Sequence, residues 1–352
     1  MSSPTLRLTS FSKGGGCGCK ISPAVLQEIL ASGQADVPWP GLLVGNQSND
    51  DAAVFDLGQG QALVSTTDFF LPIVDDPYDF GQIAAANAIS DVYAMGGRPL
   101  LAIAILGWPL DRLDTATARR VMEGARAICQ QAGIPLAGGH SVDTQDPLFG
   151  LSVSGLVETG RLKRNHTAQV GDLLYLTKPI GTGILSTAEK KELLEPRHRE
   201  ELVRQMTALN RIGRILAEEV PVNAMTDVTG FGLLGHLIEM AEGSGVTANL
   251  SYARVPVMEG VRAYLAQKAV PDATFRNWNA YSQKTQMETG VPVMEAFHLL
   301  PDPQTNGGIL FSAPESAAGR IAECLLREGY PAHVQPIGHC TEPGEKVVVV
   351  QP

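Results

Sequence analysis

The chain has 352 residues, of which 44% are hydrophobic and 18% charged, and its formal net charge at pH 7 is -10. This composition is typical of a folded globular protein, and the length predicts two domains. The acidic balance argues against nucleic-acid binding, and the lack of an 18-residue apolar run or a signal-like N-terminus predicts a cytoplasmic protein without a membrane span.

The first distinctive element is GGGCGCK at residues 14–20, in which a single glycine separates Cys17 from Cys19 and Lys20 follows. So many glycines indicate either a disordered tail or a loop that moves or passes close to a ligand. A lysine beside a thiol favours the thiolate, which acts as nucleophile or metal ligand. No strand is predicted before this segment, so its likeness to a glycine-rich phosphate loop is superficial.

The next elements predict a mixed α/β domain that ends near residue 158. A short helix over 23–31 and a long loop precede a hairpin formed by AAVFDL and QALVSTTDFF. The elements expected after the hairpin are a helix at 79–97, a strand at 99–108, a helix at 114–133, a strand at 134–141 that runs into the glycine turn GGHS, and a strand at 149–158.

A second series of elements follows the linker VETGRLKRNHTAQV, where we place the domain boundary. It comprises a strand, glycine turn and helix at 171–188, helical sequence at 198–219, a strand end at 224–230, a helix at 231–243, mostly helical sequence at 257–290, a strand at 307–312, a helix at 314–328 and two closing strands. The predicted division is therefore a flexible segment 1–48, a domain 49–158 and a domain 170–352.

Four aspartates occupy strand ends or a helix face beside small residues, namely Asp51, Asp68, Asp91 and Asp227. Each alone is explained by capping or a turn. Together they indicate more, because carboxylates that the fold brings close repel one another unless a hard cation such as Mg²⁺ lies between them. An acidic cluster that faces a phosphate needs such a metal.

Glycine turns could supply the remainder of a phosphate site. Backbone N–H groups of GGHS at 138–141 and of SNDD at 48–51 are suited to binding anions. The sequence has neither GxxxxGK[ST] nor a GxGxxG after a strand, which argues against a P-loop NTPase and a dinucleotide-binding domain.

Eight segments in this order resemble the selenophosphate synthetase (selenide, water dikinase) family over almost the whole chain: GGGCGCKISP, DDAAVF, STTDFF, ANAISDVYAMGG, AGGHS, TKPIGTG, TDVTGFGLLGH and DPQTNGG. ISDVYAMGG and TDVTGFGLLGH are similar to the wider aminoimidazole ribonucleotide synthetase superfamily. The GCGCK loop distinguishes the selenide enzymes from thiamine monophosphate kinase and the hydrogenase maturation dehydratase. One departure is Asn306, where serine is expected in the family.

The resemblance implies a two-domain α/β (α+β) fold like that of aminoimidazole ribonucleotide synthetase, in which the N-terminal mixed sheets of a homodimer form a β-barrel and ATP binds between the domains. It implies that ATP, hydrogen selenide and water give selenophosphate, AMP and orthophosphate. Selenophosphate would supply selenium for selenocysteine and selenium-modified tRNA. A protein that delivers selenide is a further partner to consider.

The resemblance also assigns roles to individual residues. Asp51, Asp91 and Asp227 would hold several Mg²⁺ ions against the triphosphate, with Asp68 on the nucleotide and metal side of the same cluster. Cys17 and Lys20 match the catalytic positions, and a soft thiolate suits a soft chalcogen. The ATP contacts implied are Lys20, Ser48, Asn49, Asp50, Asp68, Asp91, Gly139, His140 and Ser141.

Several residues keep two interpretations. Cys19 is either a second selenium or metal ligand or a small neighbour of Cys17, and no second Cys or His pair at zinc spacing follows it. His140 is either a proton shuttle or a partner of the turn, and Asn87 either orients a ligand or satisfies its helix face. For His236 we expect a packing or supporting role. Cys129 lies in amphipathic helical sequence and is expected in the core, as are Cys324 and Cys340. The five cysteines form no disulfide framework in a chain of this length.

Two other functions are compatible with parts of the sequence. A non-catalytic selenium or metal carrier would use the Cys-x-Cys loop but would leave the four aspartates and the glycine turns without a purpose. Another ATP-binding member of the superfamily would use the aspartates but not the thiols.

Overall fold

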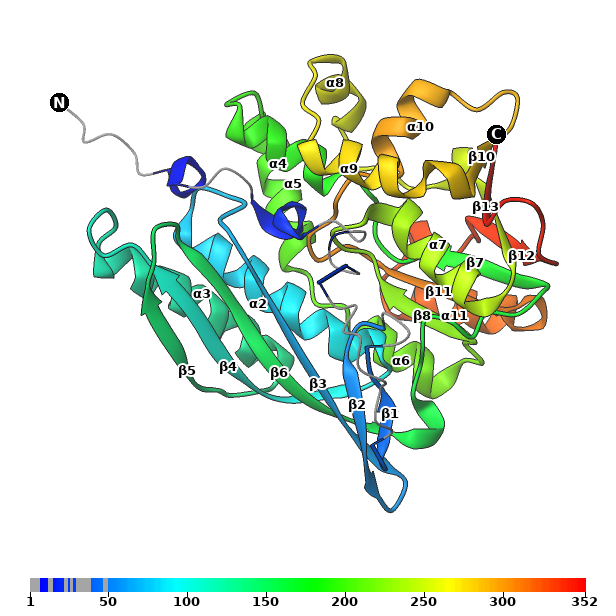
Figure 1. Cartoon of the computed structure of the whole chain (residues 1–352), viewed down its shortest axis with the longest axis horizontal. Coiled ribbons are helices and arrows are strands. Elements are labelled where there is room, and N and C mark those ends of the chain that lie inside the picture. The colour runs from blue at the N-terminus through cyan, green and yellow to red at the C-terminus, as the bar shows by residue number, and fades with distance from the viewer. Residues whose placement is uncertain (1–6, 12–14, 22–24, 26–27, 30–38, 47–49) are drawn as a thin grey trace.

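The computed structural model describes residues 7–11, 15–21, 25, 28–29, 39–46 and 50–352. The helix expected over 23–31 lies largely outside these residues, as do Ser48 and Asn49. Two short 3₁₀ turns are described in the N-terminal part, η1 (Leu8–Phe11) and η2 (Gly16–Cys19). The rest of the chain forms two mixed sheets with helices between and around them (Figure 1).

The N-terminal sheet contains six described strands in the order β1-β2-β3-β6-β4-β5. Its pairings are antiparallel except for the parallel pair β4 and β5. The expected hairpin is confirmed as β2 and β3, which the tight turn at 59–60 joins. The strand bounds are β1 (Leu42–Val44), β2 (Ala53–Gly58), β3 (Gln61–Phe70), β4 (Arg98–Trp108), β5 (Leu136–Asp143) and β6 (Leu148–Glu158).

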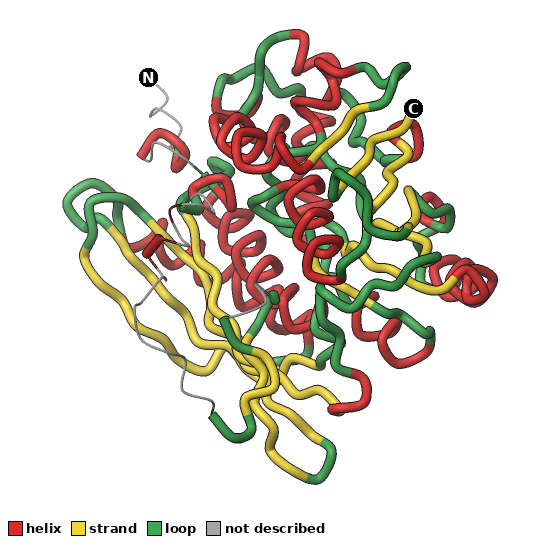
Figure 2. The backbone as a smooth tube through the Cα atoms, turned by 45° about the vertical axis from the view of Figure 1, so that its right-hand side comes forward, coloured by secondary structure: helices red, strands yellow, loops and turns green. Residues whose placement is uncertain are grey.

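Two long helices, α2 (Pro77–Ala94) and α3 (Thr115–Ala132), cover one face of this sheet (Figure 2). The Asp76 side chain caps α2 by accepting the N–H groups of Tyr78 and Asp79, and proline occupies the first helical position. Asp114 caps α3 as expected, and Gly133 ends it in the left-handed conformation. Local sequence therefore sets both helix ends.

The second sheet contains seven described strands in the order β10-β13-β9-β12-β7-β11-β8. The strand bounds are β7 (Asp172–Leu176), β8 (Ala224–Asp227), β9 (Thr247–Ser251), β10 (Thr285–Met287), β11 (Ile309–Pro314), β12 (Gly338–Thr341) and β13 (Val348–Gln351). The helix bounds are α4 (Thr182–Lys190), α5 (Pro196–Thr207), α6 (Ile212–Glu219), α7 (Gly232–Ser244), α8 (Val261–Ala266), α9 (Asp272–Tyr281), α10 (Val293–Leu299) and α11 (Ala318–Arg327). The mostly helical sequence expected at 257–290 thus also contains the short strand β10.

Helix α2 connects the two halves of the molecule. It packs on β3 and β6 of the first sheet and contacts β8, α5 and α6 of the second half. One buried hydrophobic cluster includes Val64 of β3, Ile89 of α2 and Leu174 of β7, so the core is continuous across this region. Polar side chains placed on α2 are consequently held between two packed sheets.

The expectation of a glycine turn at GGHS is wrong, because residues 138–141 lie inside strand β5. The pairing of β5 with β4 shifts register between Ala102 and Ala104, as at a β-bulge. A Cβ atom at Gly139 would lie 2.3 Å from the carbonyl oxygen of Ala104. Glycine here permits close approach between two strands and does not make a turn.

The face of the first sheet opposite α2 and α3 is exposed and partly apolar. Phe55, Phe69, Leu101 and Ile103 point to this side and are each between 39% and 47% exposed. Strand β5, at the outer edge in Figure 1, is exposed along most of its length. Among the described helices, none combines the length and apolar character that a membrane crossing requires.

Candidate active site

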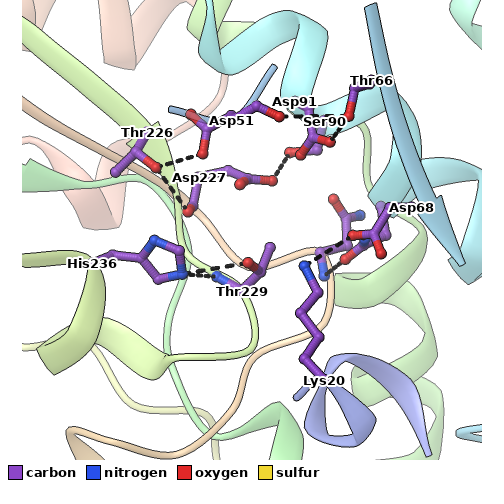
Figure 3. A network of polar contacts seen from close by, with 12 residues as sticks. Lys20, Asp51, Thr66, Asp68, Ser90, Asp91, Thr226, Asp227, Thr229 and His236 are labelled. Atoms are coloured by element: carbon purple, nitrogen blue, oxygen red, sulfur yellow. Dashed lines mark hydrogen bonds and ion pairs between the residues drawn. The ribbon is translucent and has the colours of Figure 1, made fainter. Parts of the chain in front are cut away.

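The four aspartates singled out in the sequence meet where α2 lies between the two sheets (Figure 3). Asp51 lies two residues before β2, Asp68 lies on the inner face of β3, Asp91 is on α2, and Asp227 ends β8. The fold thus brings together side chains from four segments of the chain, and their role in binding metal stays a prediction.

Each aspartate accepts a hydrogen bond from a neighbouring polar side chain, which fixes its orientation. Thr226 donates to Oδ1 of Asp51 at 2.7 Å, and Asn87 donates to Oδ2 of Asp68 at 2.7 Å. The remaining two donors are the hydroxyls of Thr66, which bonds Asp91, and of Ser90, which bonds Asp227. Threonine, serine and asparagine thus position all four carboxylates before a ligand binds.

Burial and mutual repulsion disfavour the charged forms of these groups. Burial, followed by the charges of Asp227 and Asp91, raises the pKa of Asp51 well above its usual range. The pKa of Asp91 is raised in the same way, first by burial and then by Asp227 and Asp68. Burial raises the pKa of Asp227 to about 6. A cluster with this much uncompensated negative charge is suited to receiving cations.

Carboxylate oxygens are suitable ligands for a hard divalent cation, although these side chains do not form a complete metal site by themselves. Oδ2 of Asp51 is buried and has no hydrogen-bond partner among the described residues. Oxygen ligands of this kind are those that Mg²⁺ uses, generally together with water and substrate phosphates. Within the described part of the chain, no three acidic, histidine or cysteine side chains converge closely enough to hold a metal ion by themselves. Phosphate oxygens would have to complete the coordination.

Lys20 provides positive charge next to this cluster. Its ammonium nitrogen lies 3.3 Å from Oδ2 of Asp68, and the side chain is 38% exposed. It follows η2, whose backbone is described while the side chains of Cys17 and Cys19 lie outside the described part. The backbone N–H of Gly16 donates to the carbonyl of Leu71 at 3.0 Å, which anchors the loop beside the end of β3. Lys20 therefore brings the glycine loop next to the aspartates.

Asp50, another predicted nucleotide contact, neighbours Asp51, but its carboxylate faces the segment after β6. The carboxylate of Asp50 accepts the backbone N–H of Asn165 at 2.7 Å and lies 3.4 Å from Nδ1 of His166, and its side chain is only 1% exposed. It thus binds the segment after β6. Ser48 and Asn49 lie outside the described residues.

Gly139, His140 and Ser141 are not beside the cluster of their own chain. Asp68 pairs across the sheet with Leu151, Leu151 with Ala104, and Ala104 with Gly139. Three strand spacings of about 4.8 Å put Gly139 roughly 14 Å from the backbone of Asp68. These three exposed residues share a row with the site but do not reach it within one chain.

Asn87 connects the two halves of the site, which explains its position on α2. Besides donating to Asp68, its Oδ1 accepts the backbone N–H of Asn306 at 2.7 Å. Asn306 lies in the left-handed region with φ of 48°, a conformation that asparagine tolerates better than serine. Its side chain donates to the carbonyls of Met206 and Ala208. The DPQTNGG segment is thereby fixed against Asp68.

Two supporting residues were not predicted from the sequence. Asn210 donates to the hydroxyl of Ser90 at 2.8 Å, and Ser90 in turn bonds Asp227. The buried ammonium of Lys178 donates to the carbonyls of Ala208 and Asn306 at 2.8 and 2.9 Å. Burial lowers the pKa of Lys178 to about 7. The sequence motif TKPIGTG contains Lys178, and this motif was the sequence feature that could have pointed to it.

His236 on α7 supports the backbone of the loop after β8. Its Nε2 accepts the N–H of Thr229 at 3.1 Å, so the ring proton is on Nδ1, which faces Oε2 of Glu239 at 3.6 Å. Burial, aided by the charge of Lys20, lowers the pKa of His236 to about 3. The ring stays neutral at physiological pH, in line with the supporting role expected for it.

Comparison with known proteins shows to which class of protein this fold belongs. The profile of the AIR synthase related protein N-terminal domain matches residues 49–157, and that of the C-terminal domain matches residues 169–351. Thiamine-monophosphate kinase from Stenotrophomonas maltophilia superposes with a TM-score of 0.65 at 21% identity, over 89% of this chain and 92% of that chain. The hydrogenase maturation protein HypE in complex with ATP gives 0.64 at 22% identity, over 86% and 84%. These likenesses establish a two-domain fold of this class.

More similar relatives identify the family. The selenide, water dikinase of Cronobacter sakazakii is 54% identical over 330 residues, which is 94% of each chain. That of Yersinia pseudotuberculosis is 50% identical over 351 residues, covering 100% of this chain and 99% of its own. The chain belongs to the selenide, water dikinase family. The resemblance seen in the sequence motifs is confirmed.

Proposed function

We propose that this protein synthesises selenophosphate from hydrogen selenide, ATP and water, with release of AMP and orthophosphate. The observation that carries the proposal is the identity of 50–54% over nearly the full chain to curated selenide, water dikinases. The buried carboxylate cluster with Lys20 beside it supplies what phosphoryl transfer requires, namely fixed ligands for cations and a positive group for the phosphates.

Asp51, Asp91 and Asp227 are the residues that would hold Mg²⁺, with Asp68 at the edge of the same set. Bound Mg²⁺ would neutralise the triphosphate and the carboxylates together. The chain itself contributes preset orientation, because Thr226, Thr66 and Ser90 already bond three of these groups. Lys20 is placed to move from Asp68 to a phosphate oxygen, since both are anionic acceptors within reach of one flexible side chain.

Cys17 is the catalytic cysteine of the proposal. Support comes from its place in η2, three residues before a lysine that reaches the aspartate cluster. Its thiol would hold hydroselenide by a hydrogen bond, selenium would form its bond to the γ-phosphorus as the bond to the β,γ-bridging oxygen breaks and ADP leaves, and the loop would exclude water. Cys19 keeps both interpretations given above.

The protein acts as a homodimer in this proposal, with the outer faces of two N-terminal sheets forming a closed barrel. Phe55, Phe69, Leu101 and Ile103 form an exposed apolar face whose burial would favour association.

The dimer would also complete the site. Gly139, His140 and Ser141 are too far from the aspartates of their own chain, so they serve ATP bound at the other subunit. In this proposal the two domains are 49–158 and 170–352, and ATP binds between them.

Product analysis tests the activity directly. Anaerobic incubation with ATP, Mg²⁺ and selenide should give AMP, orthophosphate and a phosphorus–selenium resonance in ³¹P NMR. Cys17→Ser should abolish the selenium product while ATP binding, measured by titration calorimetry, remains. ATP left intact by the wild-type protein would indicate a non-catalytic carrier. A phosphorylated product formed equally well by Cys17→Ser would indicate another ATP-binding enzyme of the superfamily.

A further inference from the structure

A cavity of about 540 Å³ borders the glycine loop. Gly15 and Gly18 of the loop, α4 and the first turns of α9 form much of its lining, and residues before η2, after β3 and in the DPQTNGG segment complete it. The blue turn of η2 is seen beside α9 in Figure 1, in agreement with the contact between the two elements. Neither Lys20 nor any of the four aspartates lines the cavity, but Pro303 and Thr305 of the DPQTNGG segment do, so the cavity adjoins the site described above.

The cavity is positively charged in a protein that is acidic overall. Lys190 and Lys191 at the end of α4 and Arg276 on α9 line it, whereas Asp272 is the one acidic residue among its described lining residues. The chain as a whole carries a formal charge of -10. A local excess of cations within an acidic surface concentrates small anions at that place and raises their rate of association.

The cavity wall is also joined to the loop by specific contacts. Arg276 donates from its guanidinium to the carbonyl of Gly18 at 2.9 Å. A Cβ atom at Gly16 would lie 2.3 Å from Ile73 and 2.5 Å from the hydroxyl of Thr305, so the loop packs tightly on its floor. The loop backbone that leads to Lys20 is therefore also a wall of the cavity.

We propose that this cavity is the site at which the hydroselenide anion enters and waits before it reacts at the loop. The inference rests on the proposed function, and it identifies where the second substrate approaches. Hydrogen selenide is a monoanion at neutral pH. On the aspartate side it would meet four carboxylates and a triphosphate, which repel it, whereas on the cavity side it meets three cations. The two anionic substrates thus reach the loop by different routes.

The charge of the cavity can be removed without touching the nucleotide site. In the double variant Lys190→Gln/Lys191→Gln, KM for selenide should rise about threefold to fivefold, as expected for two unit charges acting across roughly 10 Å of water. KM for ATP and kcat at saturating selenide should stay unchanged. The rise in KM should shrink as salt is added, because screening already weakens the attraction in the wild-type protein.

A matched control is Lys346→Gln. Lys346 donates to the carbonyl of Gln283 at 2.8 Å much as Lys191 donates to that of Lys268 at 2.7 Å, and it lies outside the cavity lining. The control should keep the wild-type KM for selenide. A second test is steric: Thr187→Trp places a large side chain in the cavity and should lower kcat/KM for selenide with little change in ATP binding.

An unchanged KM for selenide in the double variant, or an equal rise in the control, would overturn the inference. So would a rise in KM for ATP that matches the rise for selenide, since that would indicate a general effect on the active site. These outcomes differ from failure of the proposed function, in which the wild-type protein itself would form no selenophosphate.

Discussion

At the scale of single residues, Asp302 shows how burial alone can give a carboxyl group an unusual charge state. It lies after α10 at the start of the segment that fixes Asn306. Its Oδ2 accepts the N–H of Gly183 at 3.1 Å and the amide of Gln304 at 2.8 Å, while Oδ1 has no partner among the described residues. Burial raises the pKa of Asp302 to about 8. The group is consequently protonated at neutral pH in the folded protein.

This shift predicts how stability depends on pH. The pKa of Asp302 in the folded protein, about 8, exceeds its ordinary value of 3.8. Between these two pH values the folded state therefore binds more protons than the unfolded state. The free energy of unfolding consequently falls as the pH rises from about 4 to about 8. Asp302→Asn cannot ionise and lacks this contribution. The variant should gain about 1–3 kcal/mol relative to wild type between about pH 5.5 and about pH 8.5. Urea unfolding of both proteins at the two pH values measures the difference, and a gap that does not change with pH would contradict the assignment.

The residues of the site were predictable to different degrees. Asp51, Asp68, Asp91 and Asp227 could be selected because carboxylates at strand ends are locally conspicuous. The side chains that orient them could not. Asn210 acts on Ser90 across 120 positions of sequence, and such a pairing is set by tertiary packing and leaves no local pattern.

At the scale of elements, two glycines determine how closely α2 and α3 pack. A Cβ atom at Gly81 would lie 1.9 Å from the carbonyl oxygen of Val121, and one at Gly124 would lie 2.0 Å from that of Tyr78. The helix that carries Asn87 and Asp91 is therefore seated against α3 by backbone contact. Any added carbon must push the two helices apart.

Gly124→Ala should accordingly destabilise the protein by about 2–3 kcal/mol, because the clash outweighs the better helix propensity of alanine. Activity should fall as well, since α2 positions two residues of the site. Gly319→Ala is the control: Gly319 is also helical, but a Cβ there meets nothing within 4 Å. It should be neutral or stabilising by about 0.5 kcal/mol. Thermal unfolding of the pair would refute the packing argument if both variants behaved alike.

Most elements followed from the sequence. Three strands departed from it: β1 lies in the long loop expected before the hairpin, β10 lies within the helical sequence expected at 257–290, and β5 continues through the expected glycine turn. Its hydrophobic start predicts a strand, but Gly138 and Gly139 suggest a turn by composition. In the structure the strand continues, because glycine is needed there for contact with the Ala104 carbonyl. A glycine in the sequence indicates that a side chain does not fit at that position. Only the neighbouring strand in the structure shows which atoms a side chain would meet there.

At the scale of the whole molecule, the residues proposed for the nucleotide site lie in two separate places of one chain. The aspartates and Lys20 lie together, and Gly139 to Ser141 lie roughly 14 Å away at the exposed edge of the first sheet. The same sheet carries the exposed apolar outer face. A two-fold dimer would bury this face and bring the edge of one subunit to the aspartates of the other.

Subunit complementation distinguishes this arrangement from a self-sufficient chain. Asp68→Ala removes a group of the cluster, and Ser141→Trp blocks the exposed edge without disturbing a buried contact; each homodimer should be inactive. If sites are shared, a mixed dimer keeps one intact site, because the intact aspartates of one subunit face the intact edge of the other. Equal co-expression should then restore about one quarter of wild-type activity, since half of the dimers are mixed and each has one working site of two. Purification through two different affinity tags isolates the mixed dimer, in which about half of the activity per dimer should return. No recovery in that preparation would mean that each chain uses its own edge, and the proposed completion of the ATP site across the dimer would be wrong.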